Sequence, residues 1–281
     1  MEIAKAHSLG NDFLVLRQSG APGEGAGDLA RKVCDRHTGA GADGLLFISV
    51  EDAAAGLVGF RIFNADGTEA EISGNGLRCA AAVLARDGTI TTPRILFRTT
   101  AGDRPCELLA RDGNVFSFRV DMGVPRFSSA EIPFDDGSVH ERIVDYPLTI
   151  QQRILPITCV NVGNPHCIVF VERFFPARVL WNQVGHEIES HPFFPNRTNV
   201  EFVRVINKQE IEVLFWERGV GETMSSGSGA CAAAVAVILK GLTSNEVKVW
   251  TSLGQLTVRW EDHRIFQSGP AEVVFLGEYL G

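Results

Sequence analysis

Residues 73–84 read SGNGLRCAAAVL, and residues 226–237 read SGSGACAAAVAV. Both stretches begin with Ser-Gly-x-Gly and continue into a run of small apolar residues, and the second lies 153 positions after the first. The segments LGNDF (9–13) and VGNPH (162–166) are separated by the same interval. A repeated interval of this size indicates that the chain is built from two duplicated halves.

The run of small residues in each copy predicts a helix, over residues 74–86 in the first half and 227–240 in the second. A helix that is apolar on every side is buried on every side. Two more helices are predicted over 28–37 and 175–182, and strand patterns outnumber the helices and seldom alternate with them. The sequence therefore predicts an α+β protein of two pseudo-symmetric domains, each a mixed, mostly antiparallel sheet curled around a central apolar helix.

The boundary between the halves is expected near residues 125–134, a segment with two prolines and several serines. We assign residues 125–268 to the C-terminal domain. The last predicted strand, 272–279, is expected to return to the first domain, so that domain comprises residues 1–124 and 269–281.

Composition limits the possible partners. Of 281 residues, 45% are hydrophobic and 21% charged, and the formal net charge of −8 disfavours a nucleic-acid partner. No apolar stretch is long enough to cross a bilayer, and six cysteines without C-x-x-C spacing are typical of free thiols in the cytoplasm. His186 and His191 do not have the spacing of one helix face, so an exposed loop is expected there and no metal site.

The start of each predicted central helix is suited to binding an anion. A helix start offers unpaired backbone N–H groups and the positive end of the helix dipole, and glycine lets a ligand approach closely. Two such starts directed at one carboxylate place Ser73 and Ser226 on opposite faces of the adjacent carbon, which suits inversion of a stereocentre without a pyridoxal cofactor. The structural alternative is that each serine is only an N-cap, worth roughly 1 kcal/mol.

These motifs resemble those of the diaminopimelate epimerase family, over essentially the whole chain. The resemblance rests on six segments in the same order: 7–13, 34–37, 60–83, 163–167, 196–202 and 216–231. It implies a homodimeric isomerase that converts LL-diaminopimelate, a small-molecule substrate, to the meso form without a cofactor, in lysine and peptidoglycan-precursor synthesis.

The resemblance also implies roles for individual residues. Ser73 and Ser226 occupy the two catalytic positions, and His166 supports them. The residues implied to bind the reacting carboxylate through their backbone are Gly74, Asn75, Gly227 and Ser228. The residues implied to hold the substrate, mostly at its distal end, are Asn11, Asn64, Asn164, Asn199, Glu217 and Arg218. Arg218 is expected to pair with the distal carboxylate and Glu217 with an ammonium group.

The chain departs from the family at the chemistry itself, because the family has cysteine where this chain has Ser73 and Ser226. A thiol, with a pKa near 8.5, can be tuned into a thiolate at a helix start, whereas an alcohol is a poor base at neutral pH. We therefore expect strongly reduced activity. The serines are either replacements at the two reactive positions or the natural residues of a homologue with altered or lost activity. Two alternatives stay open: a catalytically silent amino-acid-binding homologue, and a related isomerase of another small amino acid.

Overall fold

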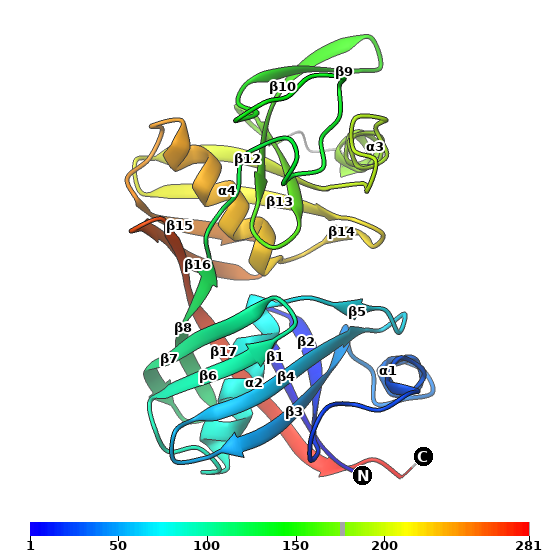
Figure 1. Cartoon of the computed structure of the whole chain (residues 1–281), viewed down its shortest axis with the longest axis vertical. Coiled ribbons are helices and arrows are strands. Elements are labelled where there is room, and N and C mark those ends of the chain that lie inside the picture. Colours follow the sequence, from blue (N-terminus) through cyan, green and yellow to red (C-terminus); the bar gives the residue numbers. More distant parts are fainter. Residues whose placement is uncertain (175–177, 281) are drawn as a thin grey trace. The chain divides into compact units, whose positions relative to one another are not determined.

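The computed structural model of the chain describes residues 1–174 and 178–280. It divides into two compact units, which are described separately here (Figure 1). Unit 1 comprises Met1–Asp121 and Ser268–Gly281, and unit 2 comprises Met122–Gln267. None of the helices in the described ranges combines the length and hydropathy needed to cross a membrane.

Unit 1 is a mixed sheet that closes on itself. Its strands are β1 (Glu2–Ser8), β2 (Asn11–Arg17), β3 (Gly44–Asp52), β4 (Leu57–Asn64), β5 (Glu69–Ala70), β6 (Arg94–Thr99), β7 (Gly102–Asp112), β8 (Val115–Gly123) and β17 (Arg264–Glu278), of which β8 ends and β17 begins within unit 2. Hydrogen-bonded neighbours follow the order β1–β2–β3–β4–β6–β7–β8–β17, and β17 pairs back with β1. The return of the last strand to the first half is therefore confirmed.

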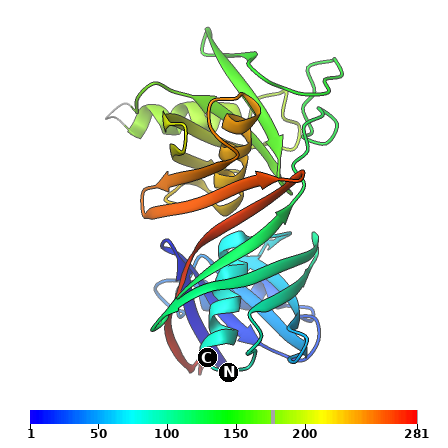
Figure 2. The same ribbon diagram turned by 90° about the vertical axis from the view of Figure 1, so that its left-hand side faces the viewer.

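Helix α2 (Gly74–Arg86) lies inside this sheet (Figure 2). Its residues from Gly74 to Leu84 are all buried, and three consecutive alanines (80–82) let the surrounding strands approach it closely. A second helix, α1 (Ala26–Cys34), lies on the outside, where Ala30 and Val33 are buried in one cluster with Leu14 of β2. Unit 1 thus has an inner and an outer helix.

Unit 2 repeats this arrangement. Its strands are β9 (Tyr146–Ile150), β10 (Arg153–Asn161), β11 (Pro165–Phe170), β12 (Asn199–Asn207), β13 (Glu210–Glu217), β14 (Gly221–Thr223), β15 (Glu246–Thr251) and β16 (Gly254–Glu261). The inner helix is α4 (Gly227–Leu239), which is buried from Gly229 to Val237, and the outer helix is α3 (Arg178–Glu189). The predicted burial of both central helices is confirmed.

The parallel strand pairs show the duplication most directly. In unit 1 they are β2–β3 and β4–β6, and in unit 2 they are β11–β12 and β13–β15, while the other pairs with a defined register are antiparallel. The same pairing therefore recurs at the same places of the two units. The predicted fold class, mixed and mostly antiparallel α+β with a central apolar helix in each half, is confirmed.

One helix prediction needs correction. The helix expected over 175–182 begins in residues 175–177, which lie outside the described residues, and the observed α3 continues to Glu189. His186 therefore lies on a helix, and the prediction of a loop there was wrong. The reason is tertiary packing: Trp181 and Ile188 of α3 are buried in the same apolar cluster as Phe202 of β12, and the Trp181 and Phe202 ring centroids are 4.8 Å apart.

Candidate active site

Ser73 and Ser226 occupy equivalent positions, each directly before an inner helix. Ser73 is the N-cap residue of α2, and its Oγ accepts a hydrogen bond of 3.1 Å from the backbone N of Gly76. Ser226 caps α4 in the same way, with a bond of 3.2 Å from the backbone N of Gly229. Capping, the structural alternative, is thus confirmed for both serines. It leaves each hydroxyl proton available for another acceptor.

The first turn of each helix is suited to an anion, because its N–H groups have no acceptor within the helix and the dipole is positive there. Gly74 and Asn75 are buried, whereas Gly227 and Ser228 are half-buried. Their role as backbone donors to a carboxylate stays a prediction.

Helix α4 starts unusually close to the sheet of unit 2. A Cβ atom added to Gly229 would lie 2.7 Å from Oε1 of Glu201 and 2.8 Å from Cδ1 of Phe215. Glycine at this position therefore allows the helix start to rest directly on two buried side chains of β12 and β13.

In unit 1 a chain of hydrogen bonds joins Asn11 to the start of α2. The Asn75 amide Nδ2 donates to Asn11 Oδ1 over 3.0 Å, and Asn11 Nδ2 donates to Asp43 Oδ2 over 2.8 Å. Behind Asn75 lies Arg78, a fully buried cation that donates to Asn75 Oδ1 and, over 2.9 Å, to Ser8 Oγ. The network fixes the orientation of both amides.

The pair Asn11–Asp43 rests on a compact group of charges. Asp12 binds Lys5 Nζ at 2.9 Å and Arg36 Nη2 at 2.7 Å, and the same Arg36 nitrogen donates to Asp43 at 2.7 Å. Burial by itself raises the pKa of Asp12, but the hydrogen bonds and charges of Arg36 and Lys5 outweigh it and bring the pKa down to about 2. Asp12 is therefore ionised at neutral pH.

Asn64 lies at the same edge of the unit 1 sheet. It ends β4 opposite Gly44, which is paired with Phe13 at the beginning of β2. Its side chain donates to Thr68 Oγ1 over 3.0 Å, and the residue is half-buried. We use the name half-site 1 for the predicted site residues of unit 1 described above, Asn11, Asn64, Ser73 and Asn75.

In unit 2 the equivalent edge carries a buried histidine–carboxylate pair. His166 Nδ1 lies 2.7 Å from Glu201 Oε1, and its Nε2 lies 2.8 Å from Asn164 Oδ1, with His166 and Glu201 both fully buried. Burial raises the pKa of Glu201, although the neighbouring His166 acts against this. Glu201 Oε2 has no hydrogen-bond partner within the described ranges.

The remaining predicted residues of unit 2 meet at the ends of β12 and β13. Asn199 Oδ1 accepts a bond of 2.9 Å from the backbone N of Arg218, and its Nδ2 donates to the Pro165 carbonyl over 2.8 Å. Glu217 Oε1 accepts a bond of 2.7 Å from Thr223 Oγ1. We use the name half-site 2 for the predicted site residues of unit 2, which are Asn164, His166, Asn199, Glu217, Arg218 and Ser226–Ser228.

At least four of the six cysteines do not supply a substitute base. All six are buried free thiols. Burial raises the pKa of both Cys34 and Cys106 to about 12, and it also raises the pKa values of Cys79 and Cys167. These four thiols are therefore protonated at neutral pH.

Three charged residues that hydrogen-bond to members of the half-sites were not predicted from the sequence: Arg78, Asp43 and Glu201. Arg78 and Glu201 have a signal that could have found them, since each has an apolar residue on both sides within a predicted helix or strand. Such a residue, if buried, needs a polar partner.

The match to a known family covers most of the chain. Residues 3–128 and 158–274 match the family model described as diaminopimelate epimerase. The chain belongs to the diaminopimelate epimerase family. A diaminopimelate epimerase of Pelotomaculum thermopropionicum is 45% identical over 283 residues, and one of Moorella thermoacetica is 41% identical over 283 residues; each alignment covers 99% of this chain and 99% of the relative.

Solved structures with low sequence identity to this chain share its fold. A predicted epimerase of Pseudomonas aeruginosa superposes with a TM-score of 0.73 at 17% identity, over 100% of this chain and 99% of that one. A hydroxyproline epimerase of Agrobacterium vitis, with bound trans-4-hydroxy-L-proline, gives 0.70 at 17% identity, over 99% and 90%. At these identities the likeness supports the fold alone.

Proposed function

We propose that this chain binds diaminopimelate and interconverts its LL and meso forms by two-base proton exchange, at a rate strongly reduced by its two serines. The reaction needs one proton-transferring group on each face of the α-carbon. We assign these two roles to Ser73 and Ser226, and the binding roles to the asparagines, Glu217 and Arg218 of the two half-sites. The proposed place of action is the cytoplasm, where free thiols persist.

One observation carries the proposal: the same capped hydroxyl recurs at the start of both inner helices. Ser73 Oγ and Ser226 Oγ each accept the backbone N–H three residues ahead, at 3.1 and 3.2 Å. A side chain held in this way lies beside the positive end of the helix dipole, which stabilises an anion. A thiol at that position ionises to a thiolate most readily. The dipole stabilises the anion of an alcohol too little for the alcohol to ionise. The two serines therefore keep the position of the catalytic side chains but do not act as effective bases.

The test is to restore the thiols. The double variant Ser73→Cys/Ser226→Cys is expected to exchange the α-proton of diaminopimelate for deuterium at least about 10²-fold faster than the chain as it stands, the usual scale of one general base. Mass spectrometry of substrate incubated in D₂O measures this rate. Each single cysteine variant should stay far below the double variant, because one face of the carbon then lacks its thiol.

Ser225→Cys is the matched control, since it adds a thiol one residue away from the proposed position and Ser225 is also buried. It should leave the exchange rate unchanged. Calorimetry with LL- and meso-diaminopimelate runs alongside. If the double variant binds either ligand and exchanges no deuterium, the assigned reaction is wrong.

The second candidate function is that of a catalytically silent amino-acid-binding protein, and the two serines are the observation that favours it. Binding of diaminopimelate without detectable deuterium exchange in the chain as it stands supports this alternative. Slow exchange that disappears in Ser73→Ala supports a residual enzyme.

We also propose that the protein is a homodimer, as the family resemblance implies. The end of β17 supports this: Val274, Phe275 and Leu276 are 52%, 40% and 55% exposed, although they lie next to one another in a paired strand.

A further inference from the structure

Glu189, the last residue of α3, is a nearly inaccessible carboxylate that binds three donors. Its residue surface is 2% exposed. Oε2 accepts a bond of 2.7 Å from Trp216 Nε1. Oε1 accepts a bond of 2.7 Å from the backbone N of Gly219 and lies 2.7 Å from Arg197 Nη2. Both oxygens are thus used, and all the donors are N–H groups.

The positions of these donors along the chain give the carboxylate its importance. Trp216 and Gly219 flank two residues only, Glu217 and Arg218, so one side chain holds both sides of what we call the 217–218 segment. Charge-assisted hydrogen bonds of this kind are stronger than neutral ones. The conformation of the 217–218 segment therefore depends on Glu189.

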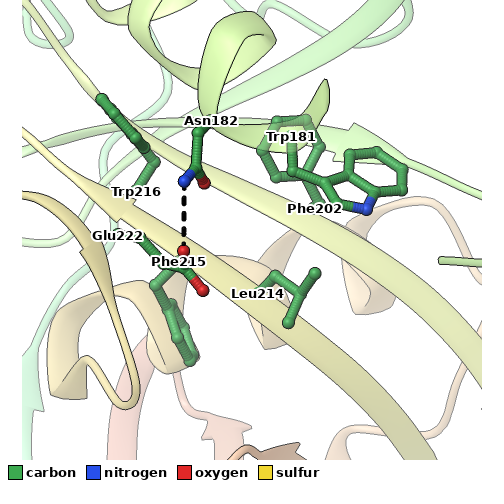
Figure 3. Close-up of a pocket in the computed structure, with 7 residues that line it drawn as sticks. All are labelled: Trp181, Asn182, Phe202, Leu214, Phe215, Trp216 and Glu222. Atoms are coloured by element: carbon green, nitrogen blue, oxygen red, sulfur yellow. Dashed lines mark hydrogen bonds between the residues drawn. The ribbon is translucent and has the colours of Figure 1, made fainter. Parts of the chain in front are cut away.

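Helix α3 is itself fixed to the β13–β14 hairpin, so Glu189 is a rigid anchor. A Cβ atom on Gly185 would lie 2.8 Å from Cγ of Trp216, which means that only glycine lets the indole rest on the helix. Figure 3 shows the amide of Asn182 directed at Glu222 of β14, with Nδ2 to Oε2 at 3.2 Å. The helix thus contacts the hairpin on both of its strands.

Unit 1 holds its equivalent turn with the opposite charge. There Arg31 of α1 donates to the carbonyl of Asp66 over 2.9 Å, between β4 and β5. The carboxylate anchor is a feature of unit 2, where the turn carries Glu217 and Arg218, the two charged residues assigned to substrate binding.

We propose that Glu189 is a positioning residue, which holds the 217–218 segment so that Glu217 and Arg218 recognise the distal, non-reacting end of the substrate. The inference rests on the proposed function for the identity of the ligand. Its geometric part, the anchoring of the segment, concerns the free protein.

Glu189→Gln is the decisive substitution, because glutamine has nearly the same shape but carries one acceptor oxygen and one NH₂ donor. One end of the amide must then face an N–H group. In the free protein, amide hydrogen exchange at Gly219 and the indole N–H of Trp216 is expected to speed up by at least about tenfold. Glu187→Gln is the control, since it removes the same charge from the same helix, where Glu187 contacts Gln151 in the turn between β9 and β10.

Calorimetry with meso-diaminopimelate tests the consequence for binding. Glu189→Gln should weaken Kd by about tenfold or more, the scale of one charge-assisted hydrogen bond. In a Glu217→Gln/Arg218→Met background the same substitution should weaken Kd by less than about twofold, because both groups that it positions have already been removed. General damage to the fold predicts equal losses in both backgrounds.

The outcomes separate the two proposals. Unchanged hydrogen exchange at Gly219 and Trp216, or equal losses of affinity in both backgrounds, overturns the role of Glu189. If the unsubstituted chain binds no diaminopimelate, the proposed function fails instead, and the exchange measurement alone decides whether Glu189 anchors the segment.

Discussion

Arg78 of α2 and Glu201 of β12 are both fully buried, yet they bring opposite charges to the two units. The repeat interval relates position 78 to Cys231. The strand pairing relates Glu201 to Leu46, because Leu46 lies opposite Ile62 as Glu201 lies opposite Phe215. Duplication has therefore kept the capped helix start in both halves, while the side chains behind it have diverged. Half-site 1 rests on a cation and half-site 2 on a histidine–carboxylate pair.

At the residue scale, the charges beneath Asn11 make a prediction about stability and pH. The pKa of Asp12 is lowered from 3.8 to about 2 in the folded chain, so the folded state binds fewer protons than the unfolded state between these values. The contribution of ionised Asp12 to the free energy of unfolding is present above pH 4 and is lost as the pH falls through 3 toward 2. Asp12→Asn should lower the free energy of unfolding by about 2 kcal/mol at pH 7, as measured by urea titration.

The difference between Asp12→Asn and the unsubstituted chain should shrink by roughly half at pH 3, where unfolded Asp12 is already protonated. Asp112→Asn, at an exposed position of β7, is the control and should stay within about 0.5 kcal/mol. A difference of the same size at pH 7 and pH 3 contradicts the ion-pair explanation.

Much of the proposed site could be predicted from the sequence, because its residues stand in repeated or ordered motifs. Asn11 follows a glycine in one copy of a repeat and Asn164 in the other, and the capping serines open both helices. Glu189 and Glu201 could not be assigned in this way. Their roles depend on partners 27 to 35 positions away in the chain, which only the folded sheet brings into contact.

At the element scale, the inner helices were predicted to within one residue, since an uninterrupted run of small residues after a Ser-Gly cap has a clear beginning and end. Short strands such as β5 and β14 were missed. They are two and three residues long, and they exist because β4 and β13 lie beside them, not because of their own propensity.

The close approach of α4 to its sheet leads to a prediction at Gly229. Alanine usually stabilises a helix relative to glycine by up to about 1 kcal/mol. Here the new Cβ would lie 2.7 Å from Glu201 Oε1 and 2.8 Å from Phe215 Cδ1, two side chains that are 0% and 3% exposed and cannot easily move. Gly229→Ala should therefore lower the free energy of unfolding by about 1–3 kcal/mol.

Gly23→Ala is the matched control, because a Cβ atom there meets no heavy atom within 4 Å. It should change the free energy of unfolding by less than about 0.5 kcal/mol. If Gly229→Ala proves as stable as the unsubstituted chain in urea titration, the helix start has more room than the structure indicates.

At the scale of the whole molecule, the surface of unit 1 bears on the homodimer proposal. Along β17, buried and less buried residues alternate from Arg264 to Val273, as expected for a strand with one face in the core. The alternation then stops, and the exposed residues 274–278 begin with Val274, Phe275 and Leu276. Three adjacent apolar side chains on a strand already paired with β1 are typical of a surface that another subunit covers.

Phe275→Asp tests this surface. An aromatic residue at the centre of an interface contributes at least about 2 kcal/mol, so the dimer dissociation constant should rise by roughly 30-fold or more. Sedimentation velocity over a concentration series measures the change. Val139→Asp is the control, because Val139 is 93% exposed on a loop of unit 2 and should leave the dimer intact. An unsubstituted chain that sediments as a monomer at tens of micromolar, or a Phe275→Asp variant that dimerises as before, rules this surface out.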